Sequence, residues 1–222
     1  MLYLYHKDAS QAQLTLLGDE HRYIFKVRRH KVDDTLYLRN LEDEVLHRYT
    51  ITFLDKRSAV LDLQESIPLA IQAKKKLHIG WCIIDPKSVE KVLPILNEMG
   101  VDTITFFYCK RSQKSFTLDF KRLEKILLNS SQQSGRSVGM KLKRAESLKT
   151  FVEENPQAKM LNFSENHFIS NTNIETIVIG CEGGFHEDET TLFRPENIVG
   201  FDTPLVLKSE SAACAAASKI LL

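Results

Sequence analysis

The stretch that decides the fold is TIVIGCEGGFHEDE, residues 176–189, in which an apolar run breaks into a loop of three glycines around a carboxylate. Gly180, Gly183 and Gly184 permit positive φ and let a ligand approach the backbone closely. The spacing differs from the G-x-G-x-x-G fingerprint of dinucleotide sites, and Glu182 would repel a pyrophosphate. The loop therefore predicts either a ligand that is not a phosphate, or only a tight turn before a helix with an acidic first turn.

Outward from this stretch, apolar runs alternate with helical patterns. Strands are expected at LHIGWCII (77–84), DTITFFYC (102–109) and ETIVIG (175–180). One helix is expected to end near Gly100, with a kink or early break at Pro94, and another to span residues 120–127. Consecutive apolar positions in the strands predict an α/β domain with a parallel sheet covered on both faces.

The first third of the chain has a different pattern. Short β-type runs at 35–39, 47–54 and 58–64 predict a small β-barrel or sandwich. Pro68 and the lysines at 74–76 mark a boundary, so the predicted domains are residues 1–70 and 74–222.

Composition restricts the class of protein. The chain has 222 residues, 43% of them hydrophobic, without an apolar run near the roughly 20 residues of a membrane span and without a signal-peptide pattern, so a cytoplasmic location is expected. Cys82, Cys109, Cys181 and Cys214 form no C-x-x-C pair, and we expect them to be reduced and buried, without a metal or a disulfide.

The net charge of +1 conceals an uneven distribution. Residues 1–73 carry 10 basic and 11 acidic side chains, residues 74–149 carry 16 and 7, and residues 150–222 carry 4 and 11. The basic middle segment is typical of a protein that binds an anionic polymer, although a solvated lysine-rich face would give the same count.

Ligands of an open parallel sheet bind beyond the carboxyl ends of its strands. We expect the loops at 108–115, 180–185 and 205–211 to converge there, on a pocket that suits a cationic sulfonium cofactor better than a nucleotide phosphate. Glu210 in the last loop either contacts the ligand or only favours the helix N-terminus. The predicted cofactor-binding residues are Gly180, Cys181, Glu182, Gly183, Gly184, Phe185, Leu205, Val206, Leu207, Lys208, Ser209 and Glu210.

The N-terminal stretch HRYIFKVRRHKVDD (21–34) interleaves cations with aromatic residues, a combination that can hold phosphates and stack on unpaired bases. The predicted RNA-binding residues are Arg22, Lys26, Arg28, Arg29 and Lys31.

Taken together, six segments resemble the RsmE family of 16S ribosomal RNA (uracil-N3)-methyltransferases, in the SPOUT superfamily. The matching segments are VRRHKVDD (27–34), NEMGV (97–101), KRS (110–112), QQSGR (132–136), IGCEGGF (179–185) and VLKSESA (206–212). The chain departs from the family motifs at Asp33, where glycine is usual, at Cys181, where proline is usual, at Lys208, where arginine is usual, and at Thr203.

The resemblance implies a PUA-like β-barrel that docks RNA, followed by an α/β SPOUT methyltransferase domain with a C-terminal trefoil knot. It further implies S-adenosylmethionine as the cofactor, a homodimer, no metal, and methylation of a uridine N3 of 16S rRNA, in free RNA or the 30S subunit, near the decoding site. Arg111 and Arg136 match family arginines and are candidates for binding RNA or stabilising the uracil; an inter-subunit salt bridge is the alternative role.

Two rival functions remain at this point. A catalytically inactive RNA-binding or ribosome-assembly protein would share most of these motifs. A dinucleotide-dependent oxidoreductase would need a phosphate fingerprint, and the sequence has none.

Overall fold

The computed structural model describes residues 2–168 and 174–222 and divides the chain into two compact units. Unit 1 comprises Met1–Gln72 and Ser131–Gly139, and unit 2 comprises Ala73–Ser130 and Met140–Leu222. The first boundary lies close to the predicted one. The second segment of unit 1 was not predicted, because QQSGR (132–136) lies within a stretch whose pattern is that of the α/β domain.

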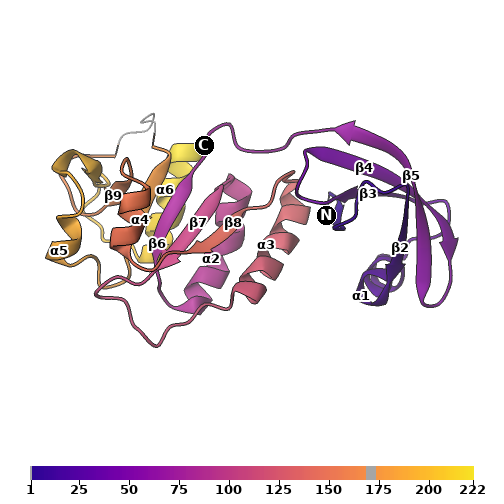
Figure 1. Cartoon of the computed structure of the whole chain (residues 1–222), viewed down its shortest axis with the longest axis horizontal. Coiled ribbons are helices and arrows are strands. Elements are labelled where there is room, and N and C mark those ends of the chain that lie inside the picture. Colours follow the sequence, from indigo (N-terminus) through magenta and orange to yellow (C-terminus); the bar gives the residue numbers. More distant parts are fainter. Residues whose placement is uncertain (1, 169–173) are drawn as a thin grey trace. The chain divides into compact units, whose positions relative to one another are not determined.

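Unit 1 is built on one five-stranded sheet with the order β1-β3-β4-β5-β2 (Figure 1). All neighbouring strands are antiparallel except β1 and β3. Its elements are β1 (Leu4–Tyr5), β2 (Gln13–Leu17), α1 (Gly18–His21), the π-helix η1 (Arg22–Val27), β3 (Thr35–Arg39), β4 (Val45–Leu54) and β5 (Ser58–Pro68). The three predicted strands are therefore confirmed, while β1, β2 and the helical turns had no clear signal in the sequence.

The second segment of unit 1 is tied to the N-terminus by hydrogen bonds. The Leu2 N–H donates to the Gln132 carbonyl at 2.9 Å, and the Tyr5 N–H donates to the Gln132 side-chain oxygen at 2.9 Å. The Tyr3 hydroxyl donates to the Arg136 carbonyl at 2.8 Å. Unit 1 thus needs residues from two distant parts of the chain.

Unit 2 contains a six-stranded, fully parallel sheet with the order β11-β9-β10-β6-β7-β8. Its elements are β6 (His78–Cys82), α2 (Pro86–Met99), β7 (Thr103–Phe107), α3 (Phe120–Ser134), β8 (Lys141–Arg144), α4 (Leu148–Glu154), β9 (Lys159–Leu161), β10 (Thr176–Ile179), α5 (Glu187–Thr190), the 3₁₀ turn η2 (Pro195–Asn197), β11 (Ile198–Val199) and α6 (Ser209–Leu221). The predicted parallel sheet is confirmed. The end of α3, from Ser131, belongs to unit 1.

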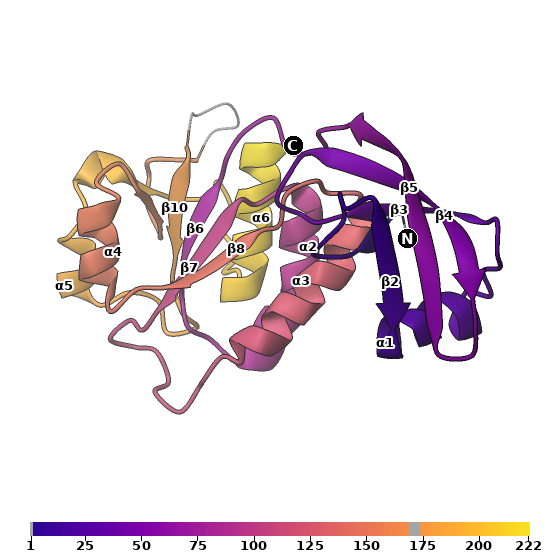
Figure 2. The same ribbon diagram turned by 45° about the vertical axis from the view of Figure 1, so that its right-hand side comes forward.

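Helices cover both faces of this sheet, as the apolar strands require. Figure 2 shows α4 on the opposite side of the sheet from α2 and α6. Successive residues of β6 follow this division. The Trp81 indole N–H donates to the Ser209 hydroxyl of α6 at 2.9 Å, whereas a Cβ on Gly80 would lie 2.6 Å from the Phe151 ring of α4.

Helix α2 continues through Pro94, so the predicted break there is wrong. A proline inside a helix costs about 3 kcal/mol. The helix buries Val89, Leu93 and Leu96, and burial of each such side chain contributes about 1.5–3 kcal/mol. Packing therefore offsets the lost hydrogen bond, and the helix ends at the predicted Gly100, whose φ of +98° suits glycine.

The prediction that all four cysteines are reduced is also wrong. Cys82 and Cys109 form a disulfide, with their Cα atoms 5.7 Å apart. Cys82 is the last residue of β6 and Cys109 follows the adjacent parallel strand β7, so both lie at the carboxyl ends of neighbouring strands. Their separation of 27 residues in the sequence hides this proximity. Cys181 and Cys214 are free thiols.

None of the helices in the described part of the chain has the length and hydropathy of a membrane span. Within the same residues, no group of His, Cys, Asp and Glu side chains is arranged to hold a metal ion.

Candidate functional site

A cavity of about 880 Å³ opens at the carboxyl ends of β9 and β10 and at the start of α6, all within unit 2. The strand order changes direction next to the cavity, between β10 and β6, since β6-β7-β8 extend one way and β10-β9-β11 the other. Open α/β sheets bind ligands beyond the carboxyl ends of their strands, close to such a change of direction. The lining residues are Arg111, Leu161, Asn162, Phe163, Ser164, Glu165, His167, Ile179, Gly180, Cys181, Glu182, Gly183, Gly184, Phe185, Phe201, Asp202, Thr203, Leu205, Val206, Leu207, Lys208, Ser209 and Ala212.

Eleven of the twelve predicted binding residues line this cavity, so the glycine loop and the segment before α6 meet as expected. Glu210 is the exception among the described residues, and it lies in the first turn of α6. The loops at 180–185 and 205–209 therefore form one site, although the first follows β10 and the second follows β11.

The glycine loop is a tight turn. The Gly184 N–H donates to the Cys181 carbonyl at 2.9 Å, and Gly184 has a φ of +68°, a conformation in which a side chain would be strained. A Cβ on Gly183 would lie 3.1 Å from the Cβ of Arg111, so this glycine makes room for the arginine. Glu182 is exposed at the cavity.

The segment before α6 presents its backbone to the cavity. In the part of the chain that the structure describes, the N–H groups of Val206, Leu207 and Lys208 donate no hydrogen bond. Helix α6 starts with Lys208 as its N-cap, without a side-chain cap bond. Ser209 instead accepts from Trp81 and donates to the carbonyl of Gly180, which fixes α6 to the glycine loop.

Sequence reasoning missed two parts of the lining, residues 161–167 and 201–203. The first follows β9, a three-residue strand too short for a periodic signal, and the second follows β11, which has two residues. The Asn162 N–H donates to the Val199 carbonyl at 2.9 Å, and the Gly200 N–H donates to the Asn166 carbonyl at 3.0 Å. A Cβ on Gly200 would lie 2.5 Å from the Ser164 carbonyl oxygen, so the two backbones run side by side in close contact.

The two candidate arginines lie in different units. Arg111 lines the cavity, and its Nη1 donates to the Gly183 carbonyl at 3.0 Å. Arg136 belongs to unit 1, where it is 8% exposed and its Nε donates to the Val138 carbonyl at 2.8 Å. The cavity of unit 2 therefore includes only the first of them.

Two contacts fix the loop that carries Arg111. The Lys110 N–H donates to the Glu189 carboxylate at 2.8 Å, and the Lys110 ammonium pairs with Asp188. This ion pair lowers the pKa of Asp188 below its usual value. Both acids belong to α5, which follows the glycine loop directly.

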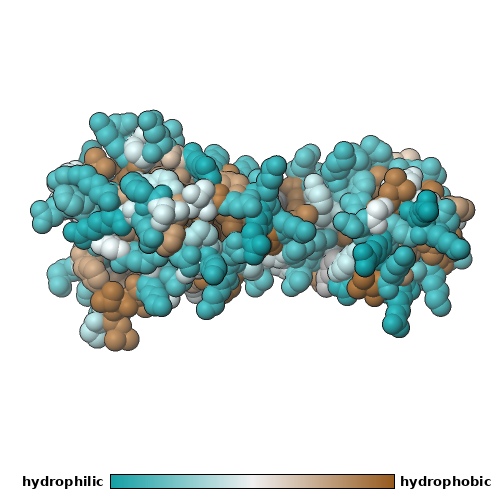
Figure 3. Space-filling model, turned by 90° about the horizontal axis from the view of Figure 1, so that it is seen from below, coloured by the Kyte–Doolittle hydropathy of each residue, from teal (hydrophilic) through white to brown (hydrophobic). Residues whose placement is uncertain are grey.

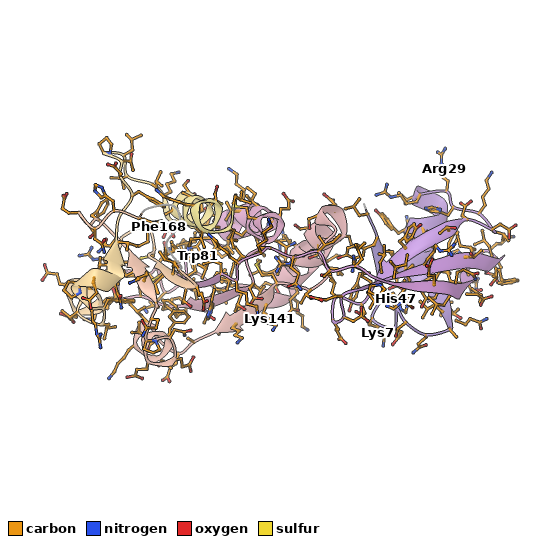
Figure 4. All side chains as sticks on the ribbon, turned by 90° about the horizontal axis from the view of Figure 1, so that it is seen from above. Lys7, Arg29, His47, Trp81, Lys141 and Phe168 are labelled. Carbon is orange, nitrogen blue, oxygen red and sulfur yellow. A yellow bond between two sulfur atoms is a disulfide. The ribbon has the colours of Figure 1, made fainter. Side chains whose placement is uncertain are left out.

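The five predicted RNA-binding cations are all exposed on unit 1. Arg28 donates from Nη2 to the Tyr23 hydroxyl at 2.8 Å and lies over the Tyr23 ring. Figure 4 shows Arg29 pointing away from the rest of unit 1. In the described part of the chain, none of the five forms an ion pair with a carboxylate, which leaves their charge available to an anion.

The departure at Asp33 has a structural meaning. Asp33 has a φ of +70°, a region that glycine adopts freely and aspartate adopts at a modest cost. Asp34 next to it accepts from the Lys31 N–H at 2.9 Å. This hydrogen bond lowers the pKa of Asp34, and the hydrogen bond from the His30 side chain lowers it further. The motif VRRHKVDD is thus a tight turn that presents its cations ahead of β3.

Apolar side chains gather at the edge of the cavity. Leu205 and Val206 are 72% and 75% exposed, and Phe163 is 79% exposed. Figure 3 shows apolar groups on the surface at this end of unit 2. A site with a glycine loop, free backbone donors and apolar walls suits a ligand of nucleoside size that is read mainly through the backbone.

Comparisons with known proteins agree with this geometry. Residues 72–221 match the family model described as an RNA methyltransferase domain. The chain is 36% identical to the ribosomal RNA small subunit methyltransferase E of Helicobacter pylori strain J99, with 98% of each chain covered.

Solved structures share the fold over nearly the whole chain. A ribosomal RNA small subunit methyltransferase E from Neisseria gonorrhoeae, bound to S-adenosyl methionine, superposes with a TM-score of 0.82 at 16% identity, with 98% of this chain and 95% of that chain covered. A methyltransferase from Legionella pneumophila, in complex with the cofactor SAM, gives a TM-score of 0.83 at 21% identity, with the same coverage. These likenesses show the shared fold, while the family model and the Helicobacter relative show that the chain belongs to the ribosomal RNA small subunit methyltransferase E family.

Proposed function

We propose that this protein transfers the methyl group of S-adenosylmethionine to N3 of one uridine of 16S rRNA near the decoding site. The observation that carries the proposal is the cavity in which the glycine loop and the segment before α6 meet. Family membership supports methylation of small-subunit rRNA. The choice of uridine N3 rests on the resemblance of the motifs.

The residues of the cavity fit this cofactor. The free N–H groups of Val206, Leu207 and Lys208 suit the polar edge of an adenine, and the apolar walls suit its faces. Glu182 at the cavity complements a positive sulfur by its charge. When bound, S-adenosylmethionine would supply an electrophilic methyl group.

The acceptor needs positioning and charge stabilisation. N3 lies on the Watson-Crick edge of uracil, so the base must be unpaired, and its imide proton must leave before or during transfer. Arg111 at the cavity would hold the RNA or the negative charge that develops on the uracil. Arg136 stays a candidate for the same task.

We propose that unit 1 is a PUA-like β-barrel that docks the RNA. Its support is the exposed set of cations without carboxylate partners and the Tyr23–Arg28 pair, which offers an aromatic face close to positive charge. The partner would be 16S rRNA, free or in the 30S subunit, in the cytoplasm.

We also propose a trefoil knot in unit 2 and a homodimer. The knot is implied by the resemblance of the motifs, and the contact of Gly200 with Ser164 leaves no room for a side chain where the two loops meet. The exposed apolar side chains of Phe163, Leu205 and Val206 are surface that a second copy would cover.

The test uses 30S subunits from a strain that lacks the gene. After incubation with protein and S-adenosylmethionine, a methyl on uridine N3 removes the pairing donor, so primer extension should stop at one new position near the decoding site. The stop should require both protein and cofactor. Methyl incorporation at another position would refute the substrate, and failure to bind S-adenosylmethionine in calorimetry would favour a catalytically inactive RNA-binding protein.

A further inference from the structure

The turn at residues 109–112 is held more firmly than a surface loop normally is. Cys109 is joined to Cys82 by a disulfide, and its N–H donates to the Ser112 hydroxyl at 3.1 Å. The Ser112 N–H donates back to the Cys109 carbonyl at 3.1 Å. At the exposed tip of this turn, Arg111 extends to the Gly183 carbonyl at the cavity.

The buried carboxylate of Glu189 supplies a further restraint on this turn. Glu189 is 6% exposed, and each of its oxygens accepts one backbone N–H at 2.8 Å. Oε2 accepts from His186 and completes the capping box of α5. Oε1 accepts from Lys110, which lies 79 residues earlier in the sequence.

The capping box explains only one of the two bonds. A Glu at the third position of a helix ordinarily returns to its own N-cap. The bond to Lys110 contributes nothing to that cap, and it joins the residue next to Arg111 to the helix that follows the glycine loop. A charged acceptor with two backbone donors makes strong, short hydrogen bonds, and removing the acceptor leaves both donors without this partner.

We propose that Glu189 is a positioning residue, which holds Arg111 at the cavity by joining the turn 109–112 to the start of α5. The inference rests on the proposed function, because it gives Arg111 a task in methyl transfer. Arg111 acts on the RNA, and Glu189 acts only through Arg111. A displacement of about 1 Å at such a group is enough to lower a rate by about 100-fold.

The test variant is Glu189→Gln, which keeps the shape of the side chain. Glutamine has one acceptor oxygen, so its amide nitrogen would face an N–H donor at either Lys110 or His186. We expect kcat on 30S subunits to fall about 10- to 100-fold, with the Kd for S-adenosylmethionine changed less than about 3-fold. The matched control is Glu187→Gln, which changes an exposed residue on the same helix. Its kcat and its Kd for S-adenosylmethionine should both stay within about 2-fold of the wild-type values.

A double-mutant cycle separates positioning from general damage. If Glu189 acts through Arg111, the pair Arg111→Ala plus Glu189→Gln should have the kcat/KM of Arg111→Ala alone. Effects that multiply would overturn the inference. Full activity of Arg111→Ala in an active wild-type background would overturn it too, while leaving the proposed function intact.

A second readout does not depend on activity. Hydrogen exchange at the backbone amides of Lys110 and His186 should be faster in Glu189→Gln and unchanged in Glu187→Gln. If Glu189→Gln folds poorly, Asp188→Asn removes the exposed Lys110 ion pair and should accelerate exchange at Lys110 in a folded protein. Unchanged exchange at Lys110 in both Glu189→Gln and Asp188→Asn would refute the inference. A wild type that fails to methylate 30S subunits would instead refute the proposed function alone.

Discussion

Gly200→Ala is the substitution for which the structure gives the sharpest expectation. The added Cβ would lie 2.5 Å from the carbonyl oxygen of Ser164, 2.9 Å from its nitrogen and 3.1 Å from the carbonyl oxygen of Asn162. An ordinary carbon–oxygen contact is about 3.3–3.6 Å, so one backbone must move by about 0.8–1 Å. No rotation of a side chain can relieve the contact, because every atom involved is main chain.

The cost follows from what that movement breaks. The parallel contact between the two segments is held by hydrogen bonds from Asn162 to Val199, from Gly200 to Asn166 and from Phe168 to Gly200. Weakening two of them costs about 2 kcal/mol, and overpacking adds about 1–3 kcal/mol. We expect Gly200→Ala to lose about 3–5 kcal/mol, a decrease of Tm on the order of 10 °C for a chain of this size.

The assay is urea unfolding followed by calorimetry with S-adenosylmethionine. Because residues 161–167 and 201–203, next to this contact, line the cavity, cofactor affinity should fall together with stability. Gly139→Ala is the control, since a Cβ there meets nothing closer than 3.9 Å. If the free energy of unfolding of Gly200→Ala stays within about 1 kcal/mol of that of the control, the contact between Gly200 and Ser164 is not as tight as described.

Three further changes have defined outcomes. Asp33→Gly should stabilise the protein by about 0.5–1 kcal/mol in urea unfolding, since φ is +70° there, and a loss of stability would contradict the turn geometry. Reversing Arg28 and Arg29 to Glu should weaken RNA binding and flatten its salt dependence in filter binding, with cofactor affinity preserved; an equal loss of cofactor affinity would indicate misfolding. Burial lowers the pKa of His78, and the positive charge of Lys143 lowers it further. The imidazole of His78 therefore binds a proton more readily in the unfolded chain than in the folded one, so the protein loses stability as pH falls below about 6.5. His78→Gln should lose less stability than the wild type between pH 7 and pH 5. If the urea midpoints of the two proteins fall equally over this range, His78 is not the cause of the loss.

The parts of the fold that could be predicted are those whose physics is local. Strands β6, β7 and β10 are continuous apolar runs because both of their faces are buried. Strand β8 was missed because it lies at the sheet edge, where KLKR can remain charged and exposed. Strands β9 and β11 owe their conformation to pairing with each other, which no short run of residues can reveal.

The candidate site likewise has parts that local sequence patterns predict and parts that depend on tertiary structure. The glycine loop and the start of α6 have their own sequence signals, and eleven of the residues predicted from them line one cavity. The loop at 161–167 has no such signal, and only the pairing of β9 with β10 brings it there. The bond from the Lys110 N–H to the Glu189 carboxylate joins residues 79 apart and follows from tertiary structure alone.

The split composition of unit 1 constrains how the chain can be made. During synthesis, Leu2, Tyr3 and Tyr5 emerge early, but their partners Gln132 and Arg136 emerge only after most of α3. A ribosome adds about 5–20 residues per second, so the N-terminal strand β1 waits several seconds for them. A gene cut between residues 72 and 73 would therefore yield an incomplete first unit, and exchanging it between relatives would require a second graft at 131–139.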